Sequence, residues 1–160
     1  MNRIFNMLVV GTMLAVGSGG LAFAAGASEA VVGTWVLNLE KSKFTPGPAP
    51  KSQTRTYAQT ADGTTLTING VGADGSTISG QSTFKYDGKD YAITGSPDFD
   101  TLALKRVNGS TVTSVQKKNG KVVASTTRTI SAHGKVLTLS SKGKDSKGAS
   151  YHNIYVFDKQ

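Results

Sequence analysis

The sequence contains no cysteine, and this absence excludes several classes of protein. Without cysteine the chain has no disulfide framework, no thiolate metal site and no cysteine nucleophile. Histidine is also scarce: His133 falls in a turn dipeptide and His152 in a strand-like run, with no carboxylates grouped around either. No Gly-x-Ser-x-Gly elbow is present. We therefore expect no metal, no cofactor and no catalytic residues, and we favour a binding protein over an enzyme.

Long apolar runs are missing as well, except near the start of the chain. Residues 7–16 are apolar, follow the basic Arg3 and precede the small-x-small tripeptide Ala22-Phe23-Ala24. This arrangement is typical of a secretory signal peptide. The alternative is a membrane anchor, but the run is shorter than the roughly 20 residues that a spanning helix needs.

The position of cleavage divides the chain into two parts. We expect cleavage after Ala24, with Ala25 and Ala27 as alternative sites. Residues 1–24 are then a signal peptide, and residues 25–160 form a single domain with no transmembrane segment. The sequence thus predicts a periplasmic or secreted protein.

Acidic residues are few, and the chain has 18 Lys and Arg against 10 Asp and Glu, a net charge of +8. Most lysines lie beside turn sequences, and aromatic residues do not alternate with them, so nucleic-acid binding is not expected. Lysine at such positions protects exposed strand edges. The alternative is attraction to an anionic envelope surface.

No window after residue 24 has an extended helical period of apolar residues. Short runs rich in Thr, Val, Ile and Leu recur instead, each followed by a glycine-containing turn, and Asp-Gly and Asn-Gly are strong hairpin signals. These signals predict a meander in which each strand pairs with the next. The ten expected strands are Thr34–Leu39, Ser52–Thr60, Thr64–Val71, Ser76–Tyr86, Lys89–Ile93, Thr101–Val107, Ser110–Lys117, Lys121–Ile130, Val136–Ser141 and Ser150–Phe157.

Ten antiparallel strands in an open sheet would leave two long edges unpaired. Closure into an up-and-down β-barrel removes both edges, and we favour this all-β architecture over a two-sheet sandwich. The segment Lys41–Pro50 holds three prolines at alternate positions and is expected to be an extended crossing or rim loop rather than a strand.

The segment Gly33–Phe44, with its Gly-x-Trp start, resembles the opening of small exported bacterial lipocalin-like proteins, members of the calycin group of β-barrels, whose function is unassigned. Similar stretches are Lys85–Tyr91, Thr94–Asp98 and Asn153–Phe157. The resemblance implies that Trp35 plugs one end of the barrel and that a late arginine, here Arg128, packs over it. The count of ten strands is closer to the fatty-acid-binding branch, although Lys41–Pro50 is too short for the helix pair of that branch.

Three arginines follow residue 24, and all of them fall inside expected strands. Strand alternation places Arg128 on one face with Ala124 and Ile130, and Arg106 on one face with Leu102 and Leu104. Arg55 shares its face with Tyr57. An inward arginine can hold a ligand carboxylate or phosphate through its planar guanidinium. The alternatives are outward orientation at a bulge and internal pairing with a carboxylate.

These features predict a barrel that binds a small amphipathic molecule, with its anionic group held by arginine. The candidate ligand-binding residues are Arg55, Arg106, Arg128, Tyr57 and Tyr86, although the tyrosines also suit ordinary cross-strand pairs. The alternative is a barrel filled by its own side chains, acting through its basic rim on an anionic envelope component or a partner protein.

Overall fold

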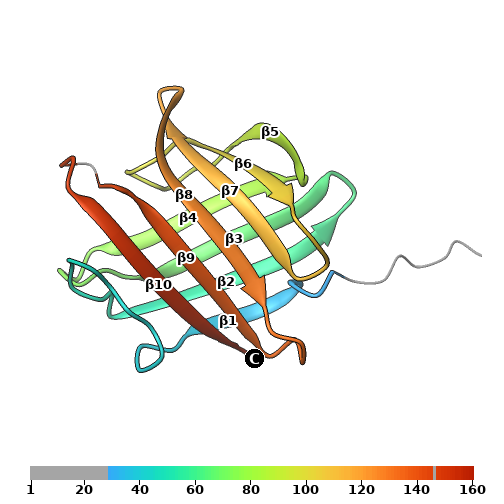
Figure 1. The fold of residues 1–160 in the computed structure, drawn as a ribbon, viewed down its shortest axis with the longest axis horizontal. Coiled ribbons are helices and arrows are strands. Elements are labelled where there is room, and N and C mark those ends of the chain that lie inside the picture. The colour runs from blue at the N-terminus through green and yellow to red at the C-terminus, as the bar shows by residue number, and fades with distance from the viewer. Residues whose placement is uncertain (1–28, 146) are drawn as a thin grey trace, which may run out of the picture.

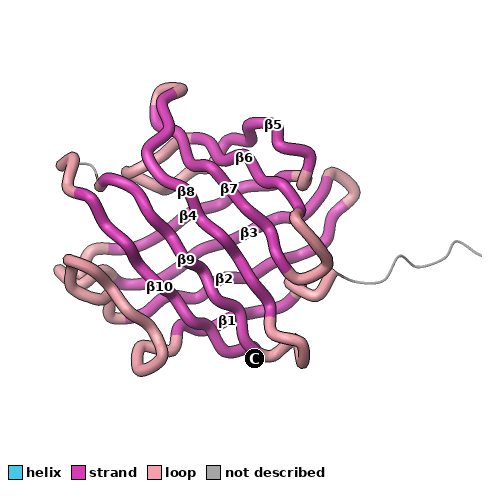
Figure 2. The backbone as a smooth tube through the Cα atoms, in the orientation of Figure 1, coloured by secondary structure: helices cyan, strands magenta, loops and turns pink. Residues whose placement is uncertain are grey.

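A computed structural model describes residues 29–145 and 147–160. The predicted signal peptide lies outside the described residues. The described chain forms ten antiparallel strands joined by loops at the two ends of the fold (Figures 1 and 2). The strands are β1 (Gly33–Leu37), β2 (Ser52–Thr60), β3 (Gly63–Val71), β4 (Thr77–Phe84), β5 (Asp87–Ala92), β6 (Thr101–Arg106), β7 (Thr111–Lys118), β8 (Lys121–Ile130), β9 (Val136–Lys144) and β10 (Ser150–Lys159).

The fold is all-β, as the sequence predicts, and the strand bounds agree with the expected ones to within a few residues. The largest difference is β9, which continues to Lys144 rather than ending at Ser141. The turn chemistry also agrees. Asn119 and Gly120, between β7 and β8, both have positive φ angles of 50° and 74°. A type I′ hairpin turn needs this conformation at both central residues.

The sheet curves into a nearly closed barrel. Its strand order is β4-β3-β2-β1-β10-β9-β8-β7-β6-β5, so the first strand pairs with the last. In Figure 1, β7 to β10 lie in front of β1 to β4 and cross them at a steep angle. The expectation that each strand pairs with the next is wrong between β4 and β5, where a single bridge joins Gln81 to Thr94. This seam stays narrow because Ser82 Oγ also donates a hydrogen bond of 2.7 Å to the Ala92 carbonyl.

The two ends of the barrel are built differently. One end, which we call the closed end, is where residues 29–32 meet the loops at 61–62, 85–86, 107–110 and 131–135. The other end, which we call the open end, is formed by the segment 38–51 and the loops at 72–76, 93–100, 119–120 and 145–149. Alternate strands run toward opposite ends because every pairing is antiparallel.

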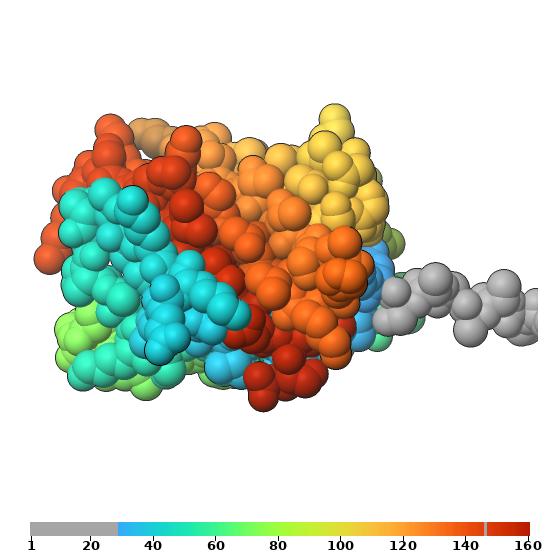
Figure 3. Space-filling view, turned by 60° about the horizontal axis from the view of Figure 1, so that its bottom comes forward, coloured from blue at the N-terminus to red at the C-terminus, as the bar shows by residue number. Residues whose placement is uncertain are grey.

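The proline-rich segment between β1 and β2 lies along β10 at the open end, as Figure 3 shows in cyan against red. Lys43 bridges Ile154, and the Val156 amide donates to Ser42 Oγ at 2.9 Å. Phe44 packs edge-on against Tyr155, with ring centroids 5.0 Å apart. The segment is an extended crossing, as its prolines predict, and it contains no helix.

The apolar core is densest at the closed end. Four large side chains there are completely buried: Trp35, Phe84, Leu137 and Phe157. Val31, just before β1, is buried with them. Among the described residues, no helix has the length and apolar character needed to span a bilayer.

Candidate functional site

A cavity of about 530 Å³ lies inside the barrel and reaches the loops of the open end. The barrel is therefore hollow, in contrast to the alternative prediction of an interior filled by its own side chains. Apolar side chains from β3 to β6 and the adjoining loops line one side. These are Leu66, Ile68, Ile78, Phe84, Ile93, Phe99, Leu102 and Leu104.

Arg128, on β8, lines the deep part of this cavity and is only 7% exposed. Its Nη2 donates a hydrogen bond of 3.0 Å to the Tyr86 hydroxyl. Its Nε is buried and has no partner among the described residues. None of the ion pairs of the described chain, taken at up to 4.0 Å, includes Arg128. In the described part of the chain, this buried positive charge at the cavity wall thus has no ion-pair partner.

Two tyrosine rings lie next to the Arg128 guanidinium. Its Cζ atom lies 5.3 Å from the ring centroid of Tyr57 and 5.3 Å from that of Tyr86. Burial acts to lower the pKa of Arg128, but the two tyrosines outweigh burial and raise it above its ordinary value. Burial raises the pKa of Tyr86, and Arg128 opposes part of that rise. The site is therefore a guanidinium cation in contact with two aromatic rings.

Arg55, on β2, also lines the cavity and shares the inward face with Tyr57, as strand alternation predicts. Its Nε donates a hydrogen bond of 3.1 Å to Gln53 Oε1. The guanidinium lies 5.5 Å from the ring centroid of Phe157. Arg55 is half-buried and adds a second positive charge to the cavity wall.

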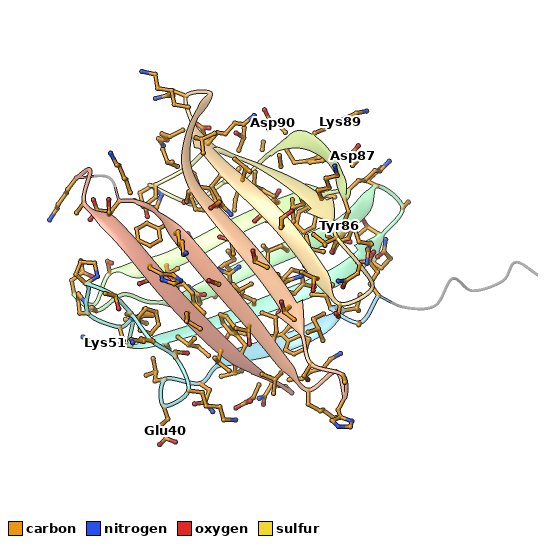
Figure 4. The ribbon with its side chains drawn as sticks, in the orientation of Figure 1. Glu40, Lys51, Tyr86, Asp87, Lys89 and Asp90 are labelled. Carbon is orange, nitrogen blue, oxygen red and sulfur yellow. The ribbon has the colours of Figure 1, made fainter. Side chains whose placement is uncertain are left out.

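Arg106 does not line the cavity, in contrast to our expectation that it faces the ligand. It lies at the end of β6, beyond the cavity, where it forms an ion pair with Glu29. Its guanidinium also lies over the Tyr86 ring, 4.4 Å from the centroid. Tyr86 itself is labelled in Figure 4, where β4 leads into β5. Strand alternation predicts which face of the sheet Arg106 is on. It does not predict how far along the barrel axis the residue lies, and Arg106 is the last residue of β6, beyond the cavity.

Trp35 is fully buried near the closed end, the place that the lipocalin resemblance implies for a plug. Its Nε1 donates a hydrogen bond of 2.7 Å to the Val31 carbonyl. The cation over its ring is Lys159, with Nζ 5.1 Å from the ring centroid. Arg128, which the resemblance places over Trp35, packs on Tyr57 and Tyr86 instead.

A row of uncharged polar side chains lines the other side of the cavity, and sequence reasoning missed it. Its members are Ser114, Gln116, Thr126, Ser141, Tyr151 and Asn153. The sequence signal that could have revealed this row is the alternation in β7, where the inward Val112 is followed on the same face by the polar residues Ser114 and Gln116. Burial raises the pKa of Tyr151, and a hydrogen bond with Ser141 opposes this rise.

Residues 29–145 and 147–160 contain no group of three or more His, Asp or Glu side chains placed to bind a metal ion. The acidic residues that line the cavity are Asp98 and Asp145, which belong to loops at its mouth. Glu29 lies beyond the deep part, where it lines a small separate pocket with Arg128 and pairs with Arg106. The deep cavity is therefore lined by apolar groups, uncharged hydrogen-bonding groups and two arginines.

Comparison with solved structures finds proteins of similar shape. No protein-family model matches the chain, and comparison with curated proteins finds no similar sequence. The crystal structure of the zebrafish ileal bile acid-binding protein in complex with cholic acid is similar in shape, with a TM-score of 0.49. It is 14% identical, and the alignment covers 82% of this chain and 99% of that protein. The family predicted from the opening motif stays a prediction.

Proposed function

We propose that this protein is an exported, non-enzymatic binding protein that holds a small amphipathic anion inside its barrel. The observation that carries this proposal is the buried, unpaired charge of Arg128. An isolated charge in an apolar interior is unfavourable because it loses its hydration. A ligand carboxylate, sulfate or phosphate supplies the missing counter-charge and accepts two hydrogen bonds from one guanidinium.

The size and lining of the cavity support a ligand with an apolar body. A volume of about 530 Å³ lies within the range of small-molecule sites in proteins. Burying apolar ligand surface against Leu66, Ile68, Leu102 and Leu104 contributes roughly 25 cal/mol per Å². Apolar burial supplies affinity, and the arginine orients the ligand with its anionic end toward the deep part of the barrel.

Export rests on the pattern at the start of the sequence. A basic residue, an apolar run and the small-x-small tripeptide ending at Ala24 are the three parts of a secretory signal. A cysteine-free domain keeps the same covalent structure in the oxidising space outside the cytoplasm. We therefore propose that the barrel binds its ligand in the periplasm or after secretion.

The test uses two fluorescent probes that differ in charge. Anilinonaphthalene sulfonate is an amphipathic anion, and N-phenylnaphthylamine is an uncharged molecule of similar shape. We expect both to bind the barrel. Arg128→Leu should weaken the sulfonate about 10-fold to 100-fold, because a hydrogen bond to a charged group is lost, and should leave the neutral probe bound.

A matched control separates the site from the net charge. Lys105→Leu also removes one positive charge, but Lys105 is exposed on the outside of β6. This variant should bind both probes as the wild type does. Equal weakening in the two variants, or no sulfonate binding by the wild type, would contradict the proposal.

We propose, as a second candidate function, contact of the β7–β8 hairpin with an anionic envelope surface. Val122 at the tip is 64% exposed, and Lys118 and Lys121 flank it. Pairing of β8 with β9 begins only at Ala124, so the tip projects from the barrel (Figure 1). Lysines around an exposed apolar side chain suit an anionic lipid surface. Binding to phosphatidylglycerol vesicles should weaken steeply with salt, and salt-independent binding would count against this contact.

A further inference from the structure

We propose that the ligand of this barrel carries hydroxyl groups along one flank, in addition to its anionic end. This inference rests on the proposed function and narrows its ligand class to hydroxylated amphipathic anions. The observation behind it is the row of polar side chains on the wall formed by β7 to β10. We call five members of this row the polar belt: Ser114, Gln116, Thr126, Ser141 and Tyr151.

The boundary between the two walls is sharp in the strand register. Leu102 on β6 lies opposite Gln116 on β7, and Leu104 lies opposite Ser114. Both leucines and both polar residues line the cavity. Neighbouring strands at the same depth thus present different chemistry. At this depth a ligand meets leucine side chains on β6 and hydrogen-bonding groups on β7.

Hydrogen bonds connect the polar belt across the strands and fix its groups in place. Gln116 Nε2 donates to Ser114 Oγ at 2.9 Å and to Thr126 Oγ1 at 3.3 Å. Thr126 Oγ1 donates in turn to Ser141 Oγ at 3.0 Å. The bonded part of the belt therefore spans β7, β8 and β9, and Tyr151 on β10 lines the same cavity. Groups held in this way are pre-organised for a ligand.

The polar belt is not complete without a further partner. Gln116 Oε1 is buried and accepts no hydrogen bond from the described residues. An unpaired buried acceptor costs about 1–3 kcal/mol, and apolar side chains at these positions avoid that cost. Stability alone therefore does not explain the belt. With Nε2 bound to Ser114 and Thr126, the amide presents its free Oε1 as an acceptor for a ligand hydroxyl.

The position of the polar belt relative to Arg128 indicates where the ligand hydroxyl lies. Thr126 precedes Arg128 by two residues on the inward face of β8, a separation of about 7 Å along a strand. Gln116 and Tyr151 lie nearer the open end. With its anion at Arg128, an extended ligand passes the belt at the middle of its chain rather than at its head.

The experiment compares stearate with a mid-chain hydroxystearate as competitors of bound anilinonaphthalene sulfonate. The hydroxylated acid should displace the probe at about threefold to tenfold lower concentration, because one hydrogen bond contributes roughly 0.5–1.5 kcal/mol. The double variant Gln116→Met, Thr126→Val should lose this preference and bind stearate at least as well. Thr127→Val, on the outward face of the same strand, is the matched control and should keep the preference.

The outcomes separate this inference from the function on which it rests. If the wild type binds the sulfonate probe but does not prefer the hydroxylated acid, the polar flank is wrong and the anion site stands. The same holds if neither acid displaces the probe. Failure of the probe itself to bind contradicts the proposed function. If the double variant does not fold, as judged by its circular dichroism, Thr126→Val alone should reduce the preference.

Discussion

The closed and open ends of this barrel use the same strands for opposite purposes. At the closed end Trp35, Leu137 and Phe157 are completely buried, and the chain before β1 packs onto them. Toward the open end the same sheet encloses a cavity. From this difference we expect stability to be concentrated at the closed end, where the inward side chains are large, while the other end stays hollow.

The largest effect is expected at Trp35, which is fully buried near the closed end. Trp35→Ala removes a fully buried side chain and its hydrogen bond to Val31, and should lower the free energy of unfolding by about 3–5 kcal/mol. Urea unfolding followed by circular dichroism measures this loss. A cost below about 1 kcal/mol would mean that the closed end is not the stabilising part of the fold.

A pair of identical truncations compares the two ends directly. Leu137 is fully buried outside the cavity, whereas Leu104 lines it and is 6% exposed. Leu137→Ala should cost about 2–5 kcal/mol, and Leu104→Ala clearly less, because Leu104 already has empty space on one side. Equal costs in urea unfolding would indicate that the cavity collapses in solution.

The smallest effect is expected from the ion pair at the closed end. Arg106 and Glu29 have side chains that are 41% and 24% exposed, so solvent screens their attraction. Glu29→Gln should therefore change the free energy of unfolding by less than about 1 kcal/mol, and less still at high salt. A larger loss would show that charge, and not only apolar packing, stabilises this end.

The sequence predicted the architecture because its turn chemistry is local. Asn119 and Gly120 specify a tight hairpin by their own conformational preferences, and similar dipeptides mark the other turns. Alternation likewise placed Arg55 and Arg128 on the inward face, since side-chain direction in a strand follows residue parity.

Features that depend on contacts between distant segments were not predictable in this way. Arg106 has the parity of an inward residue, but its partner Glu29 is 77 positions away, and nothing local indicates that pair. Lys159 over Trp35 depends on the pairing of the first strand with the last. The polar belt was missed because serine and threonine are common on both faces of strands. Only the alignment of four strands shows that these polar side chains are neighbours on one wall of the cavity.

The pairing of β1 with β10 has a consequence for how the protein is made. Asn38, just after β1, bonds to Asp158, a separation of 120 residues in the chain. During synthesis β1 must wait with one edge unpaired until β10 has emerged, and such distant pairings form slowly. Until then the nascent chain presents open strand edges to its neighbours, which is the condition that favours aggregation. The pairing that closes the ring around the cavity thus also leaves strand edges exposed until the last strand has been made.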